Sequence, residues 1–341
     1  LEDMTGIQMT DVPMNDGKVI SLLVSTQALG VSPEQISSQT GTFGIPELGT
    51  RFVREMLIEA QPKSFGDLIQ ISGLSHGTDV WNGNAQELIR SGICTISDVI
   101  GTRDSIMLYL LQKGVEPKEA FQIMELTRKG KIAKAGFAPE TEQMLRAHNV
   151  PEWYLESCKK IKYMFPKAHA VAYLMAAIRL MWFKVYHPLA FYATFFTSKQ
   201  MDFDYQAAVA GKETARRKLK EMEQKTRMEK NPKNEEQEAA LQVINEMLQR
   251  GFKFLPVRIG KSRAKIYTLE DGQIRLPYTA LKGLGENAAD ALEDATNKGQ
   301  SYLSIEELQQ SAGITNSTVD ILNEVGAFEG LPRSNQISFL G

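Results

Sequence analysis

Cysteine and long apolar runs are scarce in this sequence. Two cysteines in 341 residues, Cys94 and Cys158, cannot form a disulfide framework and fit a reducing compartment. The most apolar helical stretch, 170–178, ends at Arg179, well short of the ~20 residues that a membrane span needs. The chain opens at Leu1 without the basic and apolar leader of a secreted protein. We therefore expect a cytoplasmic protein, or a large piece of one, with no membrane partner.

Acidic residues are absent from 157–200, a segment with seven lysines and arginines. The net charge of the whole chain does not reveal this asymmetry, because 39 basic and 41 acidic residues sum to −2. An acid-free run creates a local positive potential that suits phosphates, although it could also be a solvated helix face. Disorder is excluded, since 43% of the residues are hydrophobic and the charges nearly balance.

Hydrophobic spacing predicts a mainly α fold: a multi-helix domain over the first 200 residues, then an α+β domain. Apolar residues at helical spacing predict a long helix over 168–186 that ends at His187-Pro188. The segment 64–71 predicts another helix, stopped by Gly73, and two glycines in 72–78 favour a loop. Further helices are expected at 84–91, 96–101, 103–113, 117–128, 139–148 and 151–162.

The second half changes in composition. The charge-dense stretch 210–250 predicts a long solvated helical pair, broken near Asn231-Pro232. Three β-type segments follow within 252–277, and Asp271-Gly272 predicts a small β-hairpin.

A two-glycine turn stands out near the end of the chain. Its residues are Lys282, Gly283, Leu284, Gly285, Glu286 and Asn287, and apolar helical spacing follows them. The pattern resembles a helix-hairpin-helix motif, in which backbone N–H groups of the turn and the next helix start bind a DNA phosphate. The alternative interpretation is an ordinary tight turn that binds no DNA. A second candidate unit at 314–330, with Val319, Leu322 and Val325 facing inward, favours the DNA interpretation.

Basic and aromatic residues are interleaved at 159–173. Lys167 and His169 would lie at the start of the long helix, where its positive end favours anions. Tyr163 or Phe165 could stack on a base. Alternatively, the rings are core residues and the lysines are solvated; for Tyr173 we favour the core.

These residues carry a resemblance to a known family. The stretches Lys162-Tyr-Met-Phe-Pro-Lys-Ala-His-Ala-Val-Ala-Tyr173, Ile71-Ser-Gly-Leu-Ser-His-Gly-Thr78 and Gly44-Ile-Pro-Glu-Leu-Gly-Thr-Arg-Phe52 resemble bacterial C-family replicative DNA polymerases of the PolC type. The resemblance spans nearly the whole chain. It implies a palm–fingers junction at 1–60, fingers at 61–199, a duplex-DNA-binding domain at 200–333 and a tail at 334–341.

The same resemblance implies residue roles and partners. Arg103 and Lys167 would bind the triphosphate of the incoming dNTP with His169 nearby, Tyr163 and Phe165 would flank the base, and Ser72 and His76 would line the pocket. Other partners would be primer–template DNA and the remaining palm, thumb and exonuclease parts.

Catalysis in that family needs Mg²⁺ held by palm aspartates, which would lie upstream of Leu1. We therefore expect no catalytic or metal-binding residue here, and no polymerisation by this chain alone. The pair Asp202 and Asp204 has metal-site spacing, but helix caps are the favoured interpretation. Two alternatives stay open: a non-enzymatic helix-hairpin-helix module, and a nuclease using these two aspartates.

The tail Gln336-Ile337-Ser338-Phe339-Leu340 is similar to the sliding-clamp-binding peptide that ends PolC chains. Its last two residues are reversed relative to the family pattern. A frayed terminus is the alternative.

Overall fold

The computed structural model describes residues 1–199, 203–296 and 299–334. The chain forms two compact units. One, here named the 38–185 unit, comprises Met9–Leu29 and Ser38–Val185. The other, the 186–341 unit, comprises Leu1–Gln8, Gly30–Ser37 and Tyr186–Gly341. The functional boundaries expected near 60 and 200 stay predictions.

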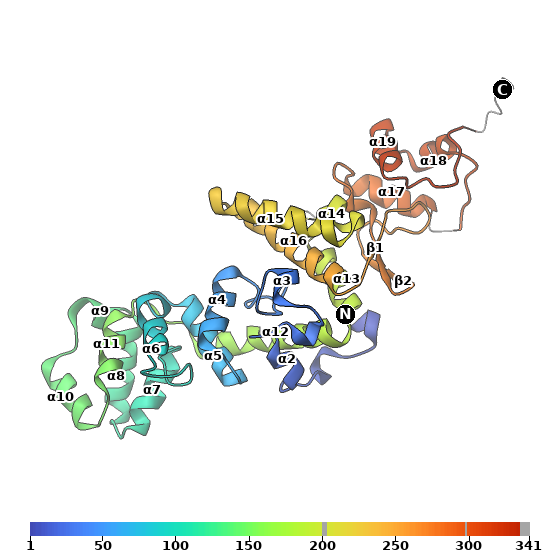
Figure 1. The fold of residues 1–341 in the computed structure, drawn as a ribbon. Helices are drawn as coiled ribbons and strands as arrows, with labels where there is room; N and C mark the ends of the chain where they lie inside the picture. Colours follow the sequence, from blue (N-terminus) through green and yellow to red (C-terminus); the bar gives the residue numbers. More distant parts are fainter. Residues whose placement is uncertain (200–202, 297–298, 335–341) are drawn as a thin grey trace. The chain divides into compact units, whose positions relative to one another are not determined.

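The 38–185 unit is built from helices, drawn from blue to green in Figure 1. They are α2 (Gly17–Ser21), α4 (Arg51–Ala60), α5 (Phe65–His76), α6 (Gln86–Arg90), α7 (Arg103–Gln112), α8 (Pro117–Arg128), α9 (Lys131–Ala135), α10 (Pro139–Ala147), α11 (Glu152–Lys160) and α12 (Lys167–Tyr186). Local sequence explains several starts: Ser64 and Thr102 form capping boxes ahead of α5 and α7. The helix expected at 96–101 is wrong, because Asp98 accepts from the N–H and hydroxyl of Thr95 and closes a turn there.

Helix α5 corrects the expectation of a loop at 72–78, because the helix continues to His76. Gly73 does not stop it. A Cβ on Gly73 would lie 2.1 Å from the carbonyl oxygen of Gly101, so this glycine lets α5 touch the backbone ahead of α7. Gly73 was expected to end the helix, but in the structure it allows two backbone segments to pack closely.

Helix α12 is the one helix among the described residues that is long and apolar enough to cross a membrane, by length and composition only. From the sequence, the apolar run 170–178 was expected to be too short for a membrane span. In the structure its face with Ala170, Leu174, Ala177 and Met181 is buried inside the unit. That spacing is typical of a core helix.

The 186–341 unit holds a helical layer, a small sheet and a cluster of short helices (Figure 1). Its helices are α1 (Glu2–Thr5), α3 (Pro33–Ile36), α13 (Pro188–Ser198), α14 (Tyr205–Ala210), α15 (Lys212–Met228), α16 (Pro232–Gln249), α17 (Glu286–Thr296), α18 (Ile305–Ala312) and α19 (Asn316–Glu324). Helices α15 and α16 lie side by side, and Asn231 caps α16 at the predicted break. The pair is not solvated throughout, because α16 is buried from Ala240 to Leu248 and Glu246 accepts a hydrogen bond from Tyr192.

The sheet has the order β1-β3-β2, with β1 (Phe254–Leu255) parallel to β3 (Gln273–Arg275) and β2 (Thr268–Glu270) antiparallel to it. Asp271 and Gly272 join β2 to β3 with φ of 51° and 73°, the backbone of the predicted hairpin turn. The mainly helical class with a small β-hairpin is confirmed.

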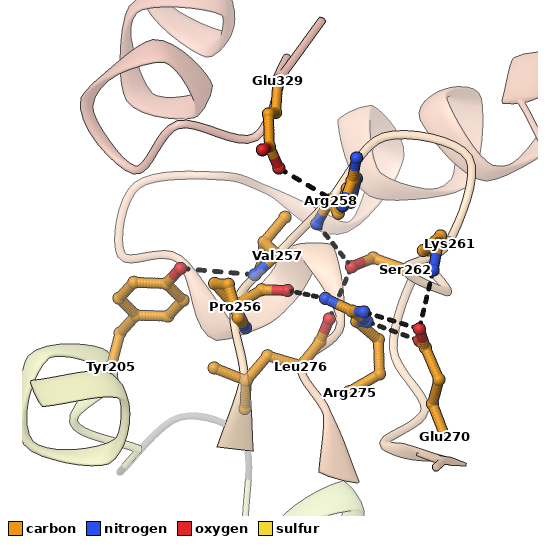
Figure 2. A network of polar contacts seen from close by, with 10 residues as sticks. All are labelled: Tyr205, Pro256, Val257, Arg258, Lys261, Ser262, Glu270, Arg275, Leu276 and Glu329. Atoms are coloured by element: carbon orange, nitrogen blue, oxygen red, sulfur yellow. Dashed lines mark hydrogen bonds and ion pairs between the residues drawn. The ribbon is translucent and has the colours of Figure 1, made fainter. Parts of the chain in front are cut away.

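Figure 2 shows the polar contacts that fasten this sheet. The side chain of Arg275 is only 6% exposed; it donates to both carboxylate oxygens of Glu270, at 2.7 and 2.8 Å, and to the carbonyl of Pro256 at 2.8 Å. Nearby, Arg258 pairs with Glu329 at 3.2 Å. The first pair neutralises a buried guanidinium, and the second ties the loop after β1 to the end of the helical cluster.

Changing Glu270 to Gln should lower the free energy of unfolding by about 2 kcal/mol at pH 7, because it leaves a buried charge poorly compensated. Hydrogen bonds from Arg275, and then from Lys261, lower the pKa of Glu270 to about 2. A lowered pKa stabilises above the unfolded value of 4.5, and that stability is lost as the pH falls from there toward 2. Urea unfolding should therefore show a difference from wild type that shrinks over this window. An equal change in the exposed Glu324→Gln control would contradict it.

Candidate functional site

The starts of α7 and α12 meet in the 38–185 unit. The N–H of Arg103, first residue of α7, donates to the carbonyl of Phe165 at 3.4 Å. The N–H of Lys167, first residue of α12, donates to the carboxylate of Asp104 at 3.0 Å. Arg103 and Lys167, which are far apart in the sequence, are thus neighbours. The positive N-terminal ends of α7 and α12 lie close together here. The Lys167 side chain is exposed, and that of Arg103 is 39% exposed.

Four rings form a ladder beside these helix starts. His76 stacks on Phe165 with centroids 4.8 Å apart, Phe165 meets His169 edge-on at 5.2 Å, and His169 lies 4.6 Å from Tyr173. Tyr173 is 49% exposed, so its assignment to the core was wrong. The helix turns it away from the buried face, and it ends an accessible aromatic surface.

Two predicted pocket residues lie differently. Tyr163 is 48% exposed and pairs with Thr78 through a short antiparallel bridge, which holds the strand-like segment before α12. Ser72 is 4% exposed inside α5, and its hydroxyl has no hydrogen-bond partner within the described part of the chain. It lies one helical turn before His76, whose Nδ1 is 2.9 Å from the Ser72 carbonyl oxygen.

The acid-free segment is less positive in the structure than in the sequence, because acids from other parts of the chain approach it. Lys159 pairs with Glu142 at 2.7 Å, Lys162 with Asp79 at 2.7 Å and Lys160 with Glu87 at 3.8 Å. Each of these three lysines therefore has a carboxylate beside it. Lys167 has no ionic partner among the residues that the structure describes, which leaves the positive charge at the ring ladder.

Sequence reasoning missed two contributors to this site, Asp104 and Glu47. Asp104 orients the start of α12, as described above. Glu47 reaches His76, with Oε2 and Nε2 3.0 Å apart. Glu47 lies in a quoted motif, but its pattern carries no signal for a contact with a helix 29 positions away.

The two-glycine turn opens α17 in the 186–341 unit. Leu284 is buried and anchors the turn, whereas Lys282, Gly283, Gly285, Glu286 and Asn287 are exposed. Gly283 has φ of 91°, a conformation that favours glycine, and no atom lies within 4 Å of a Cβ built on Gly285. The first N–H groups of any helix lack intrahelical acceptors, so this exposed start can bind an anion.

One lysine partly offsets the charge of two acidic side chains near this turn. Lys265 lies 3.0 Å from both Glu286 and Asp290, and these carboxylates raise the pKa of Lys265. The second candidate helix-hairpin-helix unit, expected at 314–330, contains α19. Helix α18 precedes it, and Gly313 forms a left-handed turn between α18 and α19. Val319 and Leu322 are buried as expected, whereas Val325 is half-buried at the end of α19.

Metal chemistry finds no support in the donor sets of the described residues, where no group of three His, Cys, Asp or Glu could hold an ion. The predicted cap is confirmed for Asp204, which accepts from the N–H of Ala207 and pairs with Lys218, both at 2.9 Å.

Burial raises the pKa of Cys158 to about 12 and that of Cys94 to about 11, so both thiols stay protonated at neutral pH. Asp202 and the tail at 336–340, predicted to bind a sliding clamp, lie outside the described residues.

Comparison with known proteins gives two family matches. Residues 2–147 match the bacterial DNA polymerase III alpha subunit finger domain, and residues 251–337 match a helix-hairpin-helix motif. The segment 159–173 lies beyond the first match and the glycine turn lies within the second. The described ring ladder therefore draws on residues inside and outside the finger-domain match.

Individual relatives match this chain over nearly its whole length. The chain is 47% identical to the DNA polymerase III PolC-type of Listeria innocua over 338 residues, which are 99% of this chain and 23% of that protein. It is 45% identical to that of Clostridium perfringens over 343 residues, and 44% identical to that of Staphylococcus epidermidis over 338, each again 23% of the relative. The chain thus spans about a quarter of the length of these relatives. It belongs to the PolC-type DNA polymerase III family, of which it carries the finger domain and a helix-hairpin-helix motif.

Proposed function

We propose that this chain is the nucleotide- and duplex-binding portion of a cytoplasmic replicative DNA-directed DNA polymerase. The observation that carries the proposal is the meeting of two helix starts, Arg103 and Lys167, beside a ring ladder. A triphosphate suits the two positive helix ends and the Lys167 ammonium. The exposed ring of Tyr163 or the half-buried ring of Phe165 suits the base.

The exposed glycine turn and the start of α17 hold the primer–template duplex through its phosphates, without reading its sequence. The buried Leu284 fixes the turn, and Lys282 adds a positive charge. Nucleotidyl transfer requires Mg²⁺ and its carboxylate ligands; the described residues do not form such a set, so we route no chemical step through them. The palm, thumb and exonuclease parts would come from the rest of the polymerase, and the tail would bind the sliding clamp. This chain alone is inactive.

Binding by the purified chain should separate the two sites. Arg103→Ala combined with Lys167→Ala should weaken binding of a dNTP at least tenfold and leave duplex affinity unchanged, because charge-assisted contacts to phosphate are lost. Lys282→Ala should weaken duplex binding severalfold and reduce the salt slope by about one, because one phosphate contact is lost. NMR titration with dGTP and fluorescence titration with labelled duplex at several salt concentrations measure the two.

The exposed Lys118→Ala in α8 is the matched control and should change neither affinity. Duplex binding that is insensitive to salt would overturn the phosphate mechanism. Normal duplex binding with no dNTP binding by the wild type would favour a helix-hairpin-helix module without a nucleotide site. Magnesium-dependent cleavage by the chain would favour the nuclease alternative.

A further inference from the structure

Glu47 stands in a backbone conformation that side-chain-bearing residues seldom adopt. Its φ is 68°, in the left-handed region, and the carboxylate is 24% exposed. Strained backbone persists where the surroundings hold it, and it is frequent at functional sites. The surroundings here are specific: the Thr42 hydroxyl donates to the Leu48 carbonyl at 2.8 Å, and buried Lys184 donates to the carbonyl of Phe43 at 2.7 Å. The loop is thus built to present one carboxylate.

That carboxylate meets His76, and both ring nitrogens have hydrogen-bond partners. Nδ1 of His76 lies 2.9 Å from the Ser72 carbonyl and 2.9 Å from the Ser75 hydroxyl. Nε2 lies 3.0 Å from Glu47, and because a carboxylate only accepts, Nε2 donates in that bond. The ring is therefore held at both nitrogens, and Glu47 holds it at Nε2.

The His76 ring lies directly on the predicted nucleotide wall. Its ring and that of Phe165 are stacked, with an interplanar angle of 26°. Stacked rings attract each other beyond the area that they bury. The backbone of Phe165 is held separately by the N–H of Arg103. His76 is thus a contact that orients the Phe165 side chain.

We propose that Glu47 is a positioning residue of the nucleotide site. Its carboxylate accepts a hydrogen bond from Nε2 of His76 and holds that ring stacked on Phe165, which fixes the ring wall beside the base. Glu47 itself contacts no nucleotide. The inference rests on the proposed function, since it names a residue that serves the same site.

Glu47→Ala tests the proposal, because it removes the carboxylate that holds His76. In the purified chain, the His76 and Phe165 ring resonances should shift, and binding of dGTP should weaken about fivefold to tenfold, as expected when one charge-assisted contact is lost. Binding of inorganic triphosphate, which has no base, should stay unchanged. Glu47→Gln, whose amide oxygen can still accept from Nε2, should restore most of the dGTP affinity. Glu55→Ala, which removes an exposed pair with Arg51 on α4, is the matched control and should change none of these.

His76→Phe keeps a ring on Phe165 but removes the bond to Glu47. It should weaken dGTP binding as Glu47→Ala does, and the double variant should lose no more than either single one, because both residues act through one contact. Unchanged His76 and Phe165 ring resonances in Glu47→Ala would overturn the proposal, as would full dGTP affinity in that variant. If wild type binds no dGTP while Glu47→Ala shifts the rings, the proposed function and the nucleotide role of Glu47 both fall, and the contact is one of packing. If wild type binds and Glu47→Ala is silent, only the positioning role falls.

Discussion

Lys184→Ala is expected to lower the free energy of unfolding of the 38–185 unit by about 4 kcal/mol, because it leaves a cavity and unpaired carbonyls. The Lys184 side chain is fully buried, and its ammonium donates to the carbonyls of Gly41 and Phe43 at 2.8 and 2.7 Å. These carbonyls belong to the loop that carries Glu47. The loop would lose its attachment to α12, and the Glu47–His76 contact should weaken with it. Urea unfolding monitored by circular dichroism measures the loss.

A methionine at the same position separates the two causes. Lys184→Met fills most of the volume but makes no hydrogen bond, so about half of the lost stability should return, on the order of 2 kcal/mol. The exposed Lys118→Ala should stay within about 0.5 kcal/mol of wild type. A Lys184→Met chain as stable as wild type would show that desolvating the ammonium costs as much as its two bonds contribute.

Gly73→Ala is expected to destabilise the same unit by about 3 kcal/mol or more, because overpacking against backbone forces the elements apart. The new Cβ would lie 2.1 Å from the Gly101 carbonyl oxygen and 2.7 Å from its carbon. Neither atom belongs to a side chain that could rotate away. Since α5 carries His76 and the segment after Gly101 begins α7, the shift should also separate His76 from the helix starts. Chemical denaturation and the His76–Phe165 ring shifts are the measurements.

The same helix offers a control of opposite sign. Gly66 lies in the first turn of α5, and the nearest atom to its Cβ position is the Ser64 hydroxyl, at an ordinary 3.5 Å. Gly66→Ala should be neutral or stabilise by up to about 1 kcal/mol, because alanine has the better helix propensity. A similar loss in both variants would mean that α5 tolerates no alanine for reasons unrelated to Gly101.

Short-range chemistry could be predicted from the sequence. The cap before Tyr205, the break at Asn231-Pro232 and the turn at Asp271-Gly272 depend on neighbouring residues, and all three are confirmed. The exposed glycine turn before α17 belongs to the same class, because it needs only glycine and one anchoring leucine. The role of each predicted site residue stays a prediction.

Long-range packing explains the errors. Gly73 was interpreted as a stop because nothing near it in sequence shows that Gly101 lies against it. The lysines of the acid-free segment looked uncompensated because their partners, such as Glu142 and Asp79, come from other parts of the chain. Tyr173 fitted the apolar pattern of α12, yet the ring contacts His169 at the surface.

By itself, the sequence determined most of the helical segments, where many of them begin, and which positive and aromatic residues the chain can offer to phosphates and bases. These properties follow from backbone preferences and side-chain chemistry over a few residues. Only the tertiary structure decided that the starts of α7 and α12 meet, that Lys167 keeps its charge free of ionic partners among the described residues, and that Glu47 reaches His76. Such contacts join positions tens of residues apart, and their energies exist only once the elements are packed together.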